Sequence, residues 1–132
     1  MRVNLTAPLR LTRYVADERQ LIESPDCRDL VAATVRVLQG LSQISGEAFP
    51  VDETQLLALA STVVVTDRDT RSVDQVVQSN HAKQRVPFKA ITGSLTFADV
   101  PLGLLPWLYW GGKLHVGDRR GAGAGGWNVT LE

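Results

Sequence analysis

The chain has 132 residues, with 14 Lys and Arg against 14 Asp and Glu and a hydrophobic fraction of 44%. We expect one α+β domain over residues 1–132, because this length can bury one core but not two. One cysteine and two histidines exclude a disulfide framework and argue against a zinc site, so we expect no metal and no cofactor. The sequence shows neither a long apolar run nor a signal peptide, so we expect an intracellular protein with no membrane partner.

The charge is unevenly distributed along the chain. Residues 1–79 contain 8 Lys and Arg against 11 Asp and Glu, whereas residues 80–132 contain 6 against 3 and both histidines. A net charge of zero therefore conceals a basic C-terminal part. Local charge, and not the total, steers a polyanion such as a nucleic acid.

The N-terminal part predicts one strand followed by a loop. Apolar and polar side chains alternate over residues 2–13, which is typical of a half-buried strand. Pro8 lacks a backbone N–H, so this strand should lie at an edge or bulge there. Residues 17–23 are polar and predict a loop.

Two helices should follow. Ser24 and Pro25 are typical of a helix start, an amphipathic stripe continues to Ile44, and Gly46 predicts the end. Asp52 opens a capping-box-like pattern that predicts a second, shorter helix.

The middle of the chain predicts a pair of strands. The β-branched residues 61–66 indicate a strand, and residues 67–71 fit either a turn or the far end of a long, protruding strand. Residues 78–85 are polar and basic and predict a connection. The next strand, through Phe97, should carry a bulge at Thr92-Gly93.

The C-terminal part predicts a helix and a closing strand. The helix should begin at Asp99, tolerate Pro106 in its first turn and end at Gly111-Gly112. Trp107 and Trp110 have helical spacing, which favours core positions, and Trp127 opens the closing strand.

This order of elements predicts a ferredoxin-like βαββαβ unit, a four-stranded antiparallel sheet with helices on one face. RNA-recognition modules share the fold, but so do many unrelated proteins. The chain lacks the aromatic residues with which such modules stack bases.

The most unusual stretch is the glycine-rich segment, residues 113–127, K-L-H-V-G-D-R-R-G-A-G-A-G-G-W. Glycine permits positive φ and close approach of the backbone, and successive N–H groups can form an anion-binding concavity. Lys113, Arg119 and Arg120 would direct positive charge at a phosphate. The alternative is a flexible linker, but its position between a helix and a strand disfavours that interpretation. His115 lies between the apolar residues Leu114 and Val116, an alternation typical of a strand, just before the glycines.

Four passages resemble one family, the CRISPR-associated endoribonucleases that process precursor CRISPR RNA, in the RAMP superfamily. They are Thr6-Ala-Pro-Leu-Arg10, the helix from Arg28 to Leu41, residues 79–85 with Ile91-Thr-Gly-Ser-Leu95, and above all Leu105 to Trp127. The match is to the C-terminal domain of this family and covers essentially the whole chain. The sequence departs from the family pattern at Ala122 and Ala124, and in the order of basic residues around Lys83-Gln-Arg85.

The resemblance implies an RNA-binding domain that takes part in metal-independent cleavage of CRISPR repeat RNA in the prokaryotic cytoplasm. Family members usually have two such domains, with the catalytic histidine commonly in the first, so a missing N-terminal RAMP domain or other CRISPR effector subunits are expected partners. A homodimer stays open.

The cleavage that the family performs, attack of a 2′-hydroxyl on the adjacent phosphate, needs a proton acceptor, a proton donor and cations. His115 and His81 are the candidate catalytic residues. Each also fits a structural role or an RNA contact. The candidate RNA-binding residues are Lys113, Gly117, Arg119, Arg120, Gly121, Gly123, Gly125, Gly126, Lys83 and Arg85. Two alternatives remain: a non-catalytic RAMP subunit that only binds CRISPR RNA, and a small oligomeric ferredoxin-like domain that binds no nucleic acid.

Overall fold

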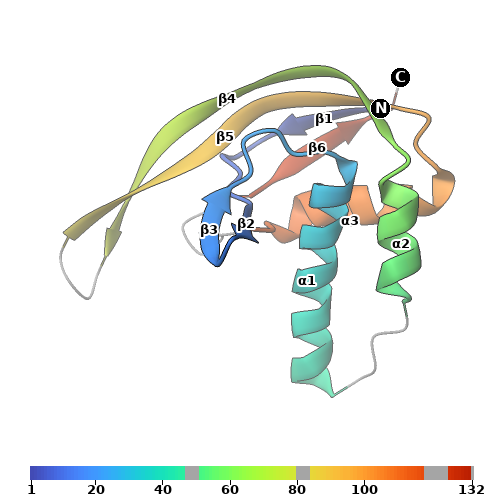
Figure 1. Ribbon diagram of the computed structural model, residues 1–132, viewed down its shortest axis with the longest axis horizontal. Helices are drawn as coiled ribbons and strands as arrows, with labels where there is room; N and C mark the ends of the chain where they lie inside the picture. Colours follow the sequence, from blue (N-terminus) through green and yellow to red (C-terminus); the bar gives the residue numbers. More distant parts are fainter. Residues whose placement is uncertain (47–50, 80–83, 118–124, 132) are drawn as a thin grey trace.

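The fold is taken from a computed structural model, which describes residues 1–46, 51–79, 84–117 and 125–131 (Figure 1). The elements in chain order are β1 (Arg2–Leu5), β2 (Thr12–Val15), β3 (Glu18–Leu21), α1 (Cys27–Ser45), α2 (Glu53–Ala60), β4 (Val64–Ser79), β5 (Gln84–Ala98), the short 3₁₀ helix η1 (Leu102–Leu104), α3 (Leu105–Leu114) and β6 (Trp127–Thr130).

Strands β4, β5, β1 and β6 form one antiparallel sheet in that order, and α1, α2 and α3 lie on the same side of it (Figure 1). Strands β1 and β6, the first and last in the chain, are thus neighbours, with β1 inside the sheet and β6 at its edge. This is the predicted ferredoxin-like arrangement, and the fold prediction is confirmed. No helix within the described residues is long and apolar enough to cross a membrane.

The two faces of the sheet differ in polarity. On the helix-covered face, Val3 pairs with Leu95 and with Val129, and the first two of these side chains are fully buried. The opposite face carries polar residues on the three neighbouring strands, namely Arg2, Asn4, Ser94, Thr96, Asn128 and Thr130. The paired residues of β5, β1 and β6 on this face are therefore polar and not aromatic.

The N-terminal strand is split, which corrects the prediction of one strand over residues 2–13. Strand β1 ends at Leu5, Leu9 forms an isolated bridge to Ile91, and β2 begins at Thr12. Residues 17–23 are not a loop, because β3 pairs with β2 in a separate hairpin. The turn uses Ala16 and Asp17 at φ 51° and 66°. Two positive φ angles suit a tight hairpin, and aspartate is a common residue in such turns whereas alanine is not.

Helix α1 begins at Cys27, two residues later than Pro25. Asp26 is its N-cap and forms a reciprocal capping box with Asp29, so the start signal is this pair. The predicted stop at Gly46 is confirmed by its left-handed φ of 76°. Helix α2 begins as predicted, with the Asp52 carboxylate accepting a hydrogen bond from the Gln55 backbone N–H.

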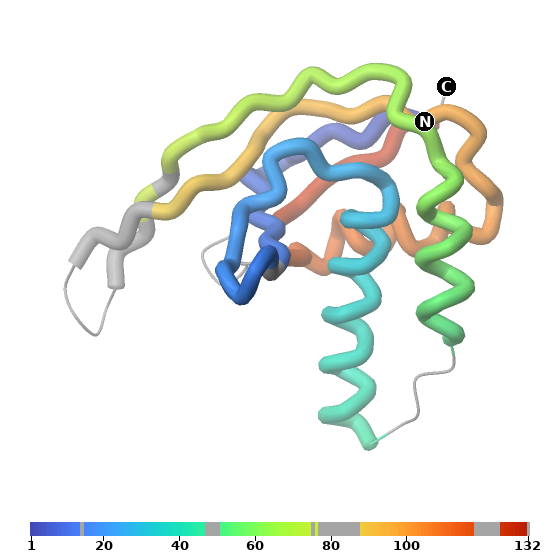
Figure 2. The backbone as a smooth tube through the Cα atoms, viewed as in Figure 1, coloured from blue at the N-terminus to red at the C-terminus, as the bar shows by residue number. Residues whose placement is uncertain are grey.

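Strands β4 and β5 form an arm that continues beyond the other strands (Figure 2). The long-strand interpretation of residues 67–71 is confirmed, although β4 begins only at Val64. The bulge prediction at Thr92-Gly93 is wrong, since Gly93 pairs in register with Thr70 and the register shifts between Val65 and Asp67. Gly93 is still required, because a Cβ there would collide with the Asp69 carbonyl oxygen.

Helix α3 corrects two predictions. It starts at Leu105 and not at Asp99, with Pro106 in the first turn as expected, and it continues to Leu114. The Gly111-Gly112 pair lies inside the helix and is buried. A Cβ at Gly111 would collide with the Thr34 hydroxyl of α1, and one at Gly112 with the Trp127 carbonyl oxygen. The pair lets α3 pack directly against α1 and β6.

Candidate nucleic-acid interface

The C-terminal end of the glycine-rich segment is fixed to the loop after β1. The Gly125 N–H donates to the Pro8 carbonyl oxygen at 2.9 Å, and the Gly126 carbonyl oxygen accepts from the Thr6 N–H at 3.0 Å. Gly125 has a φ of 88°, and a Cβ there would collide with the Val116 carbonyl oxygen. Glycine is therefore required at this position.

The first glycine of the segment lies close to the same loop. Gly117 has a φ of 87°, and a Cβ there would lie 2.5 Å from the Arg10 carbonyl oxygen. Gly117 and Gly125 thus both lie close to residues 6–10. This passage is another of the four that resemble the family in the sequence. The structure brings these two passages together.

His115 lies at the end of α3 and not in a strand, which corrects the expectation of strand-like alternation. It is the C-cap of α3 in a left-handed conformation, with φ 54° and ψ 75°, and it is exposed. Its imidazole lies beside Gly126, where an added Cβ would come within 3.3 Å of Cε1. The imidazole is thus held next to the glycine-rich segment while open to solvent.

Two basic residues lie close to the described parts of the segment, one in its first position and one in the loop after β1. Lys113 is in the last turn of α3, with Nζ 4.9 Å from the centre of the Tyr109 ring. Arg10 follows the loop that binds Gly125, and its Nη1 donates to the Lys89 carbonyl oxygen at 2.6 Å. The bond from Arg10 joins this loop to the base of the β4–β5 arm. No separate role for Arg10 could be predicted from the sequence, because only the folded chain shows its neighbours.

Several predicted site residues lie outside the described residues. They are the RNA-binding candidates Arg119, Arg120, Gly121, Gly123 and Lys83 and the catalytic candidate His81. Arg85 belongs to β5, in the arm. It is six residues beyond Ile91, the residue that pairs with Leu9, which at roughly 3.3 Å per residue is about 20 Å along the strand.

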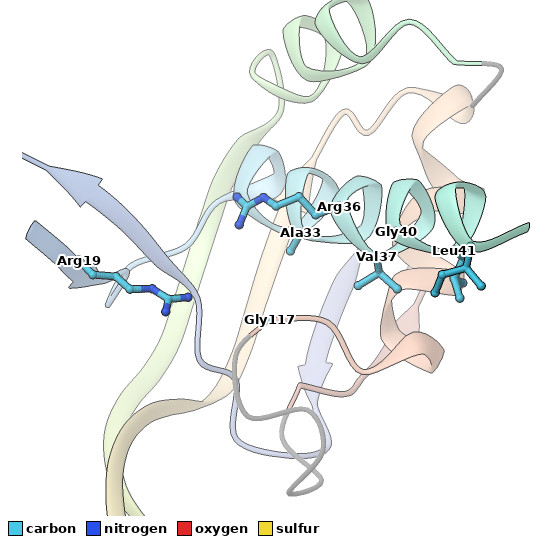
Figure 3. Close-up of a pocket in the computed structure, with 8 residues that line it drawn as sticks. Arg19, Ala33, Arg36, Val37, Gly40, Leu41 and Gly117 are labelled. Carbon is cyan, nitrogen blue, oxygen red and sulfur yellow. The ribbon is translucent and has the colours of Figure 1, made fainter. Parts of the chain in front are cut away.

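A cavity of about 440 Å³ adjoins Gly117 (Figure 3). It lies between β3 and α1, and its charged lining residues are Arg19 and Arg36. Sequence reasoning missed both arginines, because each is an ordinary polar residue in its own element. Arg19 belongs to a hairpin and Arg36 to a helix, and the two come near each other only in the folded chain. No sequence pattern within either element indicates this.

The three tryptophans have different environments. Trp127 is a core residue, 2% exposed, and its Nε1–H donates to the Leu108 carbonyl oxygen at 2.7 Å. Trp107 is partly buried against the core, as expected. Trp110 is 56% exposed, so its assignment to the core was wrong. A helix of this apolarity has no clear polar face from which the buried side can be read.

Cys27 is a buried, free cysteine at the start of α1. Burial, and then the neighbouring Asp26 carboxylate, raises the pKa of its thiol to about 12. A thiol in this state is a poor nucleophile near neutral pH. Within the described residues, no three His, Cys, Asp or Glu side chains converge to hold a metal ion.

Residues 3–127 match the family model of the CRISPR-associated endoribonuclease Cas6. The chain belongs to the Cas6 family. The match spans both the loop at residues 6–10 and the glycine-rich segment up to Trp127, so the resemblance seen in the sequence is confirmed. Comparison with curated protein sequences found no match.

Two solved Cas6 product complexes share the fold. The structure of TTHA0078 aligns with a TM-score of 0.62 at 14% identity, over 98% of this chain and 50% of the other. That of TTHB231 aligns with a TM-score of 0.64 at 18% identity, over 96% of this chain and 49% of the other. The chain therefore spans about half the length of these Cas6 proteins.

Proposed function

We propose that this chain binds CRISPR repeat RNA along the glycine-rich segment and takes part in the endoribonucleolytic maturation of that RNA. The observation that carries the proposal is the Cas6 family match, which includes both chain passages that meet at Gly117 and Gly125. The Cas6 structures that share the fold are product complexes, which supports RNA as the ligand.

The glycines and basic residues of the segment suit a phosphate ligand. The loop at residues 6–10 holds both ends of the segment, and positive φ at Gly117 and Gly125 brings the backbone close to that loop. Arg119 and Arg120 lie between these two glycines in the sequence, and Lys113 precedes them. Charge-assisted contacts from guanidinium groups to phosphate are among the strongest hydrogen bonds in proteins.

For the chemical step, the proposal assigns proton transfer to His115. The RNA 2′-oxygen forms a bond to the adjacent phosphorus, and the bond from phosphorus to the 5′-oxygen breaks. The 2′-hydroxyl proton leaves to a base, and the departing 5′-oxygen receives a proton, which yields a 2′,3′-cyclic phosphate end. An exposed imidazole beside the glycine-rich segment suits either proton transfer.

The chain spans only about half of the solved Cas6 chains, and we therefore extend the proposal to partners. The solved Cas6 chains are about twice as long as this one. We assign the remaining contacts on the RNA to a second RAMP domain, in the same or another chain. Association with other CRISPR effector subunits or a second copy of this chain belongs to the same proposal.

The test uses the intact gene product with CRISPR repeat RNA in EDTA, and scores gel shift and cleavage together. Arg119→Ala/Arg120→Ala should lower the slope of log affinity against log salt by up to about 2, roughly 0.7–0.9 for each lost phosphate contact. His115→Ala should retain the shift and lose cleavage. The matched control, Arg28→Ala/Arg71→Ala, removes the same charge from exposed positions on α1 and β4.

Each outcome is informative. Absence of any shift at low salt would overturn the binding proposal. A shift equally weakened by both double variants would show that net charge, and not the segment, attracts the RNA. Full cleavage by His115→Ala would place the proton transfer elsewhere.

A further inference from the structure

The cavity next to Gly117 combines two chemical environments. Arg19 and Arg36 extend toward one another across it from β3 and α1 (Figure 3). The rest of its lining is largely aliphatic and comes from α1, namely Ala33, Val37, Gly40, Leu41 and Ile44. These helix residues are spaced three or four apart and share one face.

The charge of the cavity favours an anion. Its lining, as far as the structure describes it, includes two arginines and no carboxylate, in a chain whose net charge is zero. Arg19 is oriented by its Nε–H, which donates to the Thr12 hydroxyl at 2.8 Å. Two guanidinium groups that line one hollow can both donate to the oxygens of one phosphate.

The aliphatic side of the cavity favours a flat apolar group beside that anion. Leu41 and Ile44 are 51% and 86% exposed, so the far end of this helix face has little covering it. A nucleotide supplies both parts, a phosphate for the arginines and a base for the helix face. A volume of about 440 Å³ is within the range of roughly 300–1,000 Å³ for small-ligand sites.

We propose that this cavity is a subsite for one unpaired RNA nucleotide, with its phosphate held by Arg19 and Arg36 and its base against Val37 and Leu41. The inference rests on the proposed function, because Gly117 places the cavity at the entrance of the glycine-rich segment. When an RNA strand is bound along that segment, the nucleotide next to the bound ones lies at the cavity. Unstacked bases outside duplex regions are the usual targets of specific RNA recognition.

Gly40 permits a steric test. It lines the cavity, and a Cβ added there meets no atom within 4 Å. Gly40→Leu therefore adds a side chain to the cavity lining with room for its Cβ, and leucine favours a helix more than glycine does. Gly40→Ala is the matched control, because it gains helix propensity but adds only one methyl group.

The experiment measures the affinity of the intact gene product for two RNAs by fluorescence anisotropy. One RNA is the repeat with its single-stranded flanks, and the other is the same repeat trimmed to its paired core. Arg19→Ala, Arg36→Ala and Gly40→Leu should each weaken binding of the flanked RNA by about fivefold or more, and each arginine variant should lower its salt slope by roughly 0.7. Binding of the trimmed RNA should not change. Arg28→Ala, on the same helix but outside the cavity, and Gly40→Ala should bind both RNAs as the wild type does.

The outcomes separate this inference from the proposed function. If the three cavity variants bind the flanked RNA as tightly as the wild type, the subsite is overturned while RNA binding stands. Equal losses of affinity for both RNAs would also overturn it, because the cavity would then not bind an unpaired nucleotide. Failure of the wild type to bind either RNA would instead overturn the proposed function. Circular dichroism of each variant confirms that it is folded.

Discussion

Gly125 donates its backbone N–H to the carbonyl oxygen of Pro8 at 2.9 Å, across more than a hundred residues of sequence. The contact depends on the left-handed φ of 88° at Gly125, where a Cβ would collide with Val116. Through it, the loop after β1 orients the last part of the glycine-rich segment. The candidate RNA interface is therefore built by two chain ends and not by the segment alone.

Gly125→Ala should destabilise the protein and weaken RNA binding together. Alanine at a position that needs positive φ costs at least about 1 kcal/mol, and the collision with Val116 adds to this. The free energy of unfolding in urea and the gel shift with repeat RNA measure the two effects. Gly40→Ala is the control, and a Gly125→Ala protein of unchanged affinity would contradict a role in RNA binding for the contact between Gly125 and the loop at residues 6–10.

Gly111→Ala and Gly40→Ala should change stability in opposite directions, although both replace a glycine inside a helix. At Gly111 the new methyl group meets Thr34 and the Trp127 ring, and overpacking of this kind costs roughly 1–3 kcal/mol. At Gly40 there is open space, and alanine should add up to about 1 kcal/mol through helix propensity. Urea unfolding of both variants checks the prediction, and equal signs would refute the packing of α3 on Trp127.

Cys27 should make stability fall with rising pH in the alkaline range. Burial, followed by the charge of Asp26, raises the pKa of its thiol from 9.0 to about 12. The unfolded chain therefore releases this proton at lower pH than the folded chain, and between these values the unfolded state binds fewer protons. The free energy of unfolding should then decrease by at most about 1.4 kcal/mol per pH unit from this group.

The measurement for Cys27 compares urea unfolding at pH 8 and pH 10 in the wild type and in Cys27→Ala. The wild type should lose more stability between these values than the variant does. Identical pH slopes would show that the thiol is not sequestered. Alkylation of the native protein at pH 8 should also be slow and should accelerate in urea.

Asp26→Ala should cost about 1 kcal/mol, within the range of roughly 0.5–2 kcal/mol for lost N-caps. The Asp26 carboxylate accepts from the Asp29 N–H at 2.9 Å, and the Asp26 N–H donates to the Asp29 carboxylate at 3.0 Å. Asp26→Asn retains an acceptor and should cost much less. Thermal unfolding of the two variants distinguishes them, and equal losses would assign the effect to charge and not to capping.

Local patterns predicted most elements of this fold. The stripe of α1, its stop at Gly46 and the cap of α2 at Asp52 depend on neighbours within one or two turns, which the sequence shows directly. The errors at Asp17 and Gly111 concern residues whose conformation depends on partners elsewhere. Alanine and aspartate form the β2–β3 turn at positive φ because the hairpin requires it.

The sequence by itself determined the ferredoxin-like order of elements, which follows from the periodicity of apolar residues. It also determined the resemblance to the Cas6 family, which four short passages carry. Only the tertiary structure decided what the glycines do. Gly111 and Gly112 let helix α3 pack closely against its neighbours. Gly117 and Gly125 let the glycine-rich segment lie against residues 6–10. The same residue type has different roles because what matters is the atom that a Cβ would meet, and that atom belongs to a distant part of the chain. The pairing of Arg19 with Arg36 in one cavity is of the same kind.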